Sequence, residues 1–110
     1  MNIYLDKVDK DKKDTLYRLL QYSLYEESLN DGNEMNEDGI FIYKYFDAYF
    51  IEKDRYAFFI REKESNKLLG FVMINKYVKK SDNAHSIAEY MVIAKYIRNH
   101  IRKNVAFECI

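Results

Sequence analysis

The stretch that decides the fold is His85–Ile110, with the sequence HSIAEYMVIAKYIRNHIRKNVAFECI. Residues 86–93 are apolar except for Glu89 near the middle, and this pattern predicts a buried strand. Residues 95–103 hold four cations, one His and one Asn, and predict a basic turn. A helix is expected to begin within that turn and to run to residue 107. A strand that leads into a helix through a basic, amide-rich turn can hold an anionic group at the helix N-terminus.

The N-terminal part of the chain changes its hydrophobic period once. Apolar residues alternate with polar ones over residues 2–8 and predict a first strand. An amphipathic helix is then expected from Asp11 or Asp14 to Glu27, because leucines recur at spacings of three and four: Leu16, Leu19, Leu20 and Leu24. Residues 28–39 are polar and acidic and predict a loop, for which a solvated connector and a cation site are the two interpretations.

Aromatic residues dominate the middle of the chain. They recur at helical spacing and predict a second helix whose aromatic stripe lies in the core: Ile42, Tyr45, Phe46, Tyr49 and Phe50. Two strands are expected next, over residues 55–62 and 67–78, joined by a hairpin turn at 63–66. Gly70 lies inside the second of them and predicts a bulge or the close approach of another backbone.

The predicted order is strand, helix, helix, strand, strand, strand, helix. An antiparallel meander flanked by helices belongs to the α+β class of mixed α/β folds. With 110 residues, 48% of them hydrophobic and 16% aromatic, the chain is expected to form one domain, 1–110, with a single core.

Composition excludes several classes of function. Eighteen basic and eighteen acidic residues cancel, which argues against a nucleic-acid binder. Cys109 is the single cysteine and cannot form an internal disulfide, so a cytoplasmic protein without a membrane segment is expected. Two His and one Cys show no ligand spacing, which argues against a metal site. No serine lies in a G-x-S-x-G motif, and no glycine-rich phosphate loop is present.

The order of elements and the run Ile-Ala-Glu-Tyr-Met-Val-Ile at residues 87–93 resemble the GNAT family of acyl-CoA N-acetyltransferases. In that family the central strand precedes a turn of the form Arg/Gln-x-x-Gly-x-Gly/Ala, which opens a helix and holds the coenzyme A pyrophosphate. Ile97, His100 and Arg102 occupy those positions here, so side chains stand where glycine gives a phosphate access to the backbone. The resemblance implies a GNAT-like fold, its N-terminal two-thirds without the usual C-terminal strands.

The resemblance also implies an activity, the transfer of an acetyl group from acetyl-CoA to an unknown amine. Glu89 would accept the proton of the amine. Backbone N–H groups of Met91, Val92 and Ile93 would hold the pantetheine and the carbonyl. The basic turn would contact the pyrophosphate through Arg98, Asn99, His100, Ile101, Arg102 and Lys103. Tyr90 or Tyr96 would be candidates to protonate the leaving thiolate, and the acidic loop would attract the amine.

The residues themselves leave alternatives open. Partial burial of Glu89 would raise the pKa of its carboxyl and suit a general base. Alternatively, Glu89 faces solvent or pairs with a lysine on the neighbouring strand. Likewise, the cations of residues 98–103 either bind an anion or belong to a solvated helix start, where the helix dipole disfavours them.

A second function remains open beside catalysis, that of a non-catalytic GNAT-like interaction or dimerisation domain. The chain ends on apolar residues 105–107 and 109–110, and the strand that begins at Ser86 is expected to have an open edge. We therefore predict a homodimer in which the partner covers that edge or the C-terminal helix.

Overall fold

The computed structural model describes residues 2–75 and 86–92. The basic turn and the C-terminal helix expected within residues 93–110 lie outside these residues, as does the turn expected at 79–84. The described elements are β1 (Ile3–Lys7), the 3-10 helix η1 (Lys10–Lys12), α1 (Lys13–Asp31), α2 (Ala48–Ile51), β2 (Arg55–Glu62), β3 (Leu68–Asn75) and β4 (Ser86–Val92). Their order is the predicted one.

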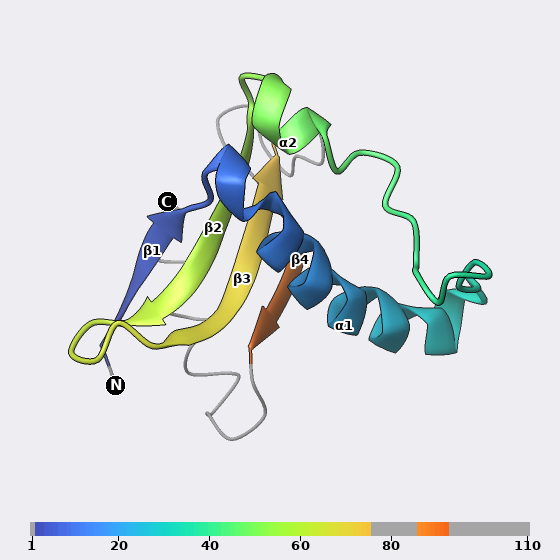
Figure 1. Ribbon diagram of the computed structural model, residues 1–110, viewed down its shortest axis with the longest axis horizontal. Coiled ribbons are helices and arrows are strands. Elements are labelled where there is room, and N and C mark those ends of the chain that lie inside the picture. Colours follow the sequence, from blue (N-terminus) through green and yellow to red (C-terminus); the bar gives the residue numbers. More distant parts are fainter. Residues whose placement is uncertain (1, 76–85, 93–110) are drawn as a thin grey trace.

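The four strands form one antiparallel sheet in the order β1-β2-β3-β4 (Figure 1). The hairpin between β2 and β3 has the predicted turn, where Asn66 takes a left-handed φ of 61°. Within the part of the chain that the structure describes, β1 and β4 are the two edges of the sheet. The α+β class predicted from the sequence is therefore confirmed.

Two bulges interrupt the sheet. The first leaves Leu69 without a partner on β2, because Ile60 pairs with Gly70 and Arg61 with Leu68. The bulge expected beside Gly70 is confirmed. The second lies in β4, where Met73 pairs with Glu89 but Ile74 pairs with residue 87, so one residue is extra on β4. Bulges bend a strand and redirect the side chains next to them, and here one of those neighbours is Glu89.

Helix α1 differs from its prediction at both ends. It begins after η1, which follows Asp9, so the expected caps Asp11 and Asp14 are wrong. Its C-terminus lies at Asp31, a full turn past Glu27, because residues 28–31 continue the helix although their polar character predicted a loop. The helix ends at Gly32, whose φ is 76° and whose N–H donates to the carbonyl of Ser28 at 3.2 Å.

Replacing Gly32 with Ala is expected to lower the free energy of unfolding by about 1–2 kcal/mol, because a left-handed conformation strains any residue with a Cβ. An added Cβ would meet no atom within 4 Å, so backbone strain is the whole cost. Urea unfolding measures the change, with Asn30→Ala on the exposed end of α1 as a control that should not destabilise. An unchanged stability of the Gly32 variant would contradict the assignment of this cap.

The second helix is much shorter than the aromatic spacing predicted. Residues 44–47 form turns closed by hydrogen bonds between residues three apart, such as Phe46 N–H to the Tyr43 carbonyl at 3.1 Å. Only α2 is helical. The aromatic stripe is accordingly divided: Phe46, Tyr49 and Phe50 pack in the core, whereas Ile42 and Tyr45 are exposed.

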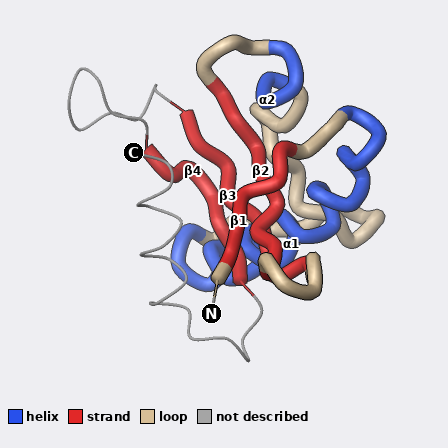
Figure 2. Tube along the Cα trace, turned by 90° about the vertical axis from the view of Figure 1, so that its left-hand side faces the viewer, coloured by secondary structure: helices blue, strands red, loops and turns tan. Residues whose placement is uncertain are grey.

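Apolar side chains pack on both faces of the sheet. On one face, α1 contacts β3 and β4 and α2 contacts β2 (Figure 1). Figure 2, viewed from the β1 edge, places α2 at the end of the sheet where β2 begins. The buried residues of this face are Val8, Leu16, Leu20, Tyr49, Ala57, Phe59, Phe71 and Met73. Those of the other face are Ile3, Ile60, Leu69, Val72 and Ile74. Because β3 is buried on both sides, its polar last residue, Asn75, stands out.

Candidate functional site

Glu89 is the most deeply buried carboxylate among the described residues, with 8% of its surface exposed. It lies on the α1 side of β4, and the hydroxyl of Ser23 donates a hydrogen bond to its Oε2 at 2.9 Å. Ser23 is equally buried, in the middle of α1. The alternative in which Glu89 faces solvent is therefore wrong, and a serine takes the place of the lysine partner.

The pKa of the Glu89 carboxyl is raised from 4.5 to about 8. Burial is the largest cause, because it removes water from the charged form. A hydrogen bond with Glu27 and the negative charges of Glu27 and Asp31 raise the pKa further, whereas the hydrogen bond from Ser23 lowers it. At pH 7 the Glu89 carboxyl is therefore mostly protonated, and it ionises within the range in which proton transfer is useful.

The acids beside Glu89 follow from the helical repeat. Ser23, Glu27 and Asp31 are four residues apart and so lie along one side of α1, next to β4. Ser23 is buried, whereas Glu27 and Asp31 are exposed. The arrangement joins one buried carboxyl to two carboxylates that water reaches, which favours the approach of a cation.

A polar and aromatic cluster borders Glu89 at the end of β3. The amide of Asn75 donates to the Tyr49 hydroxyl at 3.1 Å, and the ring of Tyr43 lies 6.4 Å from that of Tyr49. Burial raises the pKa of the Tyr43 hydroxyl well above its usual range, and Tyr49 and the charge of Glu89 act in the same direction. Tyr43 therefore stays neutral, and its hydroxyl is hydrogen bonded to Tyr49.

Most of the residues expected to hold acetyl-CoA lie outside the part of the chain that the structure describes. Met91 and Val92 end β4, where they pair with Phe71 and Gly70 of β3. Among the described strands β4 has β3 as its single neighbour. Ile93 and the basic-turn residues Arg98, Asn99, His100, Ile101, Arg102 and Lys103 lie outside the described residues.

Two other features predicted near the site are now placed. Tyr90 packs on the opposite face of the sheet from Glu89, which separates it from the candidate base. Phe41, just after the acidic loop, is hydrogen bonded to α1. The side chain of Gln21 accepts from the Phe41 N–H at 2.7 Å and donates to the Phe41 carbonyl at 2.9 Å. A hollow of about 400 Å³ lies under this loop, with Glu34 and Met35 in its wall.

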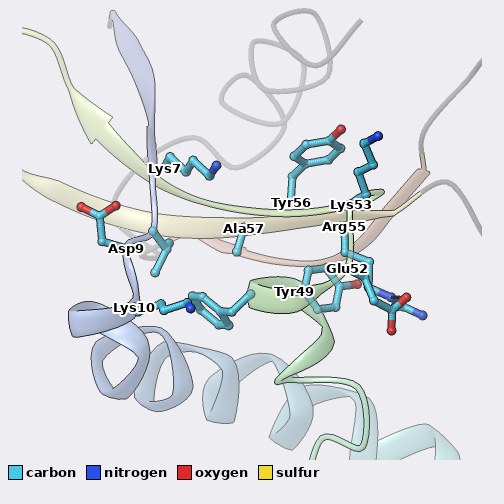
Figure 3. A pocket seen from close by; sticks show the side chains of 11 residues that line it. Lys7, Asp9, Lys10, Tyr49, Glu52, Lys53, Arg55, Tyr56 and Ala57 are labelled. Carbon is cyan, nitrogen blue, oxygen red and sulfur yellow. Dashed lines mark hydrogen bonds and ion pairs between the residues drawn. The ribbon is translucent and has the colours of Figure 1, made fainter.

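A second hollow, of about 320 Å³, lies between the end of β1 and α2 (Figure 3). Tyr49 and Ala57 line it, and the side chains of Lys7, Lys10 and Lys53 surround it. It is separate from Glu89, but Tyr49 belongs to both places, since its hydroxyl reaches Asn75. The lysines lie on different sides of the sheet in Figure 3, so they do not converge on one point.

The sequence pattern singled out Glu89 as a candidate site residue but did not point to the residues around it. Ser23, Tyr43 and Asn75 were not predicted as part of a site. One signal was available, because Asn75 is the polar residue that ends the apolar run LLGFVMI. Tyr43 gave no signal, since it is one of eleven tyrosines.

Comparison with known proteins finds no matching family model, no matching curated protein and no matching solved structure. Among residues 2–75 and 86–92, no group of three or more metal-ligating side chains comes together. None of the helices described is long and apolar enough to span a membrane.

Proposed function

We propose that this chain is an acyl-CoA-dependent N-acetyltransferase of GNAT-like fold, which transfers an acetyl group to an amine. The observation that carries the proposal is the buried Glu89 on β4, hydrogen bonded by Ser23 and bordered by the exposed acids of α1. The strand and helix order β1-α1-α2-β2-β3-β4 supports it, because it is the order that the resemblance implied for the first two-thirds of this fold.

The acceptor is an amine because of the charges near Glu89. At neutral pH an alkylamine is an ammonium ion, and Glu27 and Asp31 attract it to the site. A bound cation also lowers the pKa of Glu89, since it stabilises the ionised carboxylate. Binding of the ammonium ion therefore favours the ionised form of Glu89, which then accepts a proton from that ammonium ion.

In this proposal, residues of the chain accept the proton of the amine and hold the accepting carboxylate in place. Ser23 holds Glu89 Oε2, which fixes the carboxylate while it takes the ammonium proton, directly or through one water. Tyr43 remains neutral, held by its hydrogen bond with Tyr49, and adds no negative charge to the site. Acetyl-CoA supplies, when bound, an activated thioester whose carbon–sulfur bond is exchanged for a carbon–nitrogen bond.

The fit of acetyl-CoA to the described residues rests on the outer edge of β4. Alternate backbone N–H and C=O groups of β4, whose last residues are Met91 and Val92, face that edge beside no other described strand, and amide groups of a pantetheine arm are suited to it. The expected pyrophosphate contacts of residues 98–103 add to this edge in the proposal.

Acetyl-CoA is expected to raise the melting temperature by about 6–11 °C at a concentration about ten times its Kd, since binding then adds about 1.4 kcal/mol to stability. Differential scanning fluorimetry measures the shift. ADP, which has a pyrophosphate but neither pantetheine nor an acetyl group, is the control and should give a much smaller shift. The same melting temperature with and without saturating acetyl-CoA would contradict the proposal.

A non-catalytic interaction domain of the same fold is the second candidate function. The observation that favours it is an exposed apolar stripe on α1, on the side of that helix away from the sheet. Enzymatic activity and this stripe are compatible, so the two functions are tested separately.

A further inference from the structure

The outward side of α1 carries large side chains in water. Tyr22, Tyr25 and Leu29 are 63%, 54% and 71% exposed, whereas Leu16 and Leu20 on the inward side are fully buried. Spacings of three and four residues place the three exposed side chains in one stripe along the helix. Single exposed apolar residues are ordinary, but a continuous stripe marks a contact surface.

We propose that this outer stripe of α1, made of Tyr22, Tyr25 and Leu29, is the contact of a symmetric homodimer in which α1 packs antiparallel against α1 of a second copy. A two-fold contact uses the same surface on both partners, so the surface must be complementary to itself. The proposal does not depend on acetyl transfer.

Charge complementarity identifies the partner as a second copy. Arg18 and Glu26 are exposed and lie one turn before and one turn after Tyr22, each displaced from it by about 6 Å along the axis. An antiparallel packing centred near Tyr22 brings Arg18 of one copy within reach of Glu26 of the other, twice, and it places Leu29 of each copy beside Thr15 of the other. A parallel packing would instead place like charges side by side.

The interface is small. The stripe from Tyr22 to Leu29 is about 10 Å long, and the contact that includes Arg18 is about 16 Å long, since an α-helix rises about 1.5 Å per residue. A contact of this size belongs with weak, transient interfaces, so we expect a dimer in the micromolar range of Kd. It differs from the homodimer predicted from the sequence, in which the partner covered the edge of β4 or the C-terminal helix.

Sedimentation of the full chain over a dilution series at low salt tests the proposal. Wild-type protein should shift from dimer to monomer, and R18E and E26R should each raise the Kd by about tenfold, because each creates two like-charge pairs. Mixing R18E with E26R should restore the dimer, since every Arg–Glu pair is then re-formed between unlike chains. K63E, in the exposed hairpin far from α1, is the control and should not change the Kd.

Leu29→Ser provides a variant that does not rely on charge and should weaken the dimer by about tenfold or more. Circular dichroism verifies that each variant is folded. A wild-type chain that is monomeric at every concentration overturns the proposal. A dimer that R18E, E26R and Leu29→Ser all leave unchanged also overturns it, and places the contact elsewhere on the molecule.

Discussion

Replacing Glu89 with Gln is expected to lower kcat/KM for acetyl transfer to an amine by about 100- to 10,000-fold, the usual contribution of a general base. Glutamine keeps the size of the side chain, and its carbonyl can still accept the hydrogen bond that Ser23 donates at 2.9 Å. The loss would therefore report the missing proton acceptor and not a damaged site. Acetyl-CoA and a panel of primary amines are the substrates, with released thiol as the readout.

The pH dependence separates a base from a structural residue. In the wild type, kcat/KM should rise with pH and reach half of its plateau at about pH 8, because only ionised Glu89 accepts a proton. Glu27→Gln should move this rise to lower pH, since it removes a like charge and a hydrogen bond that raise the Glu89 pKa. Glu64→Gln, an equal loss of charge on the exposed hairpin, should leave the profile in place. Full activity of the Glu89→Gln variant would exclude Glu89 as the base.

The strands could be predicted from the sequence because their signals are local. RYAFFIRE is an apolar, aromatic-rich run bounded by turn residues, and β2 has the predicted limits, Arg55–Glu62. The helix limits failed where local signals conflict with the wider structure. Residues 28–31 are polar, yet α1 continues through them until Gly32 supplies the left-handed conformation that ends a helix.

The site was only partly predictable for a related reason. The position of Glu89 within an apolar run predicted a buried carboxylate that is costly to ionise, and Glu89 is buried in the structure. Its partner Ser23 lies 66 residues away in the chain. Hydrophobic periodicity states which side of α1 is inward, but it does not state which strand that side meets, so no sequence pattern joins these two residues. Tyr43 likewise comes just before residues 44–47, which form turns where the sequence predicted a helix.

Glu89 should also make the stability of the protein depend on pH. Its carboxyl has a pKa of about 8 in the folded chain against an ordinary value of 4.5, so the folded state binds the proton more tightly than the unfolded state. This contribution is fully present below about pH 4.5 and is lost as the pH rises through about 8. The free energy of unfolding should fall over this window by a few kcal/mol, because each pKa unit of difference is worth about 1.4 kcal/mol.

Glu89→Gln removes the ionisation and keeps the shape, so this variant should lose most of that decline. Urea unfolding of both proteins from about pH 5 to about pH 9 measures it, and at pH 9 the inactive variant should be the more stable of the two. Glu64→Gln is again the matched control and should follow the wild type. Parallel stability curves for wild type and Glu89→Gln would mean that Glu89 ionises equally easily in both states. If the wild type is active and is also less stable than Glu89→Gln at high pH, the same ionised carboxylate serves catalysis and destabilises the core. Glu89 would then be a residue that β4 keeps for catalysis at a cost in stability.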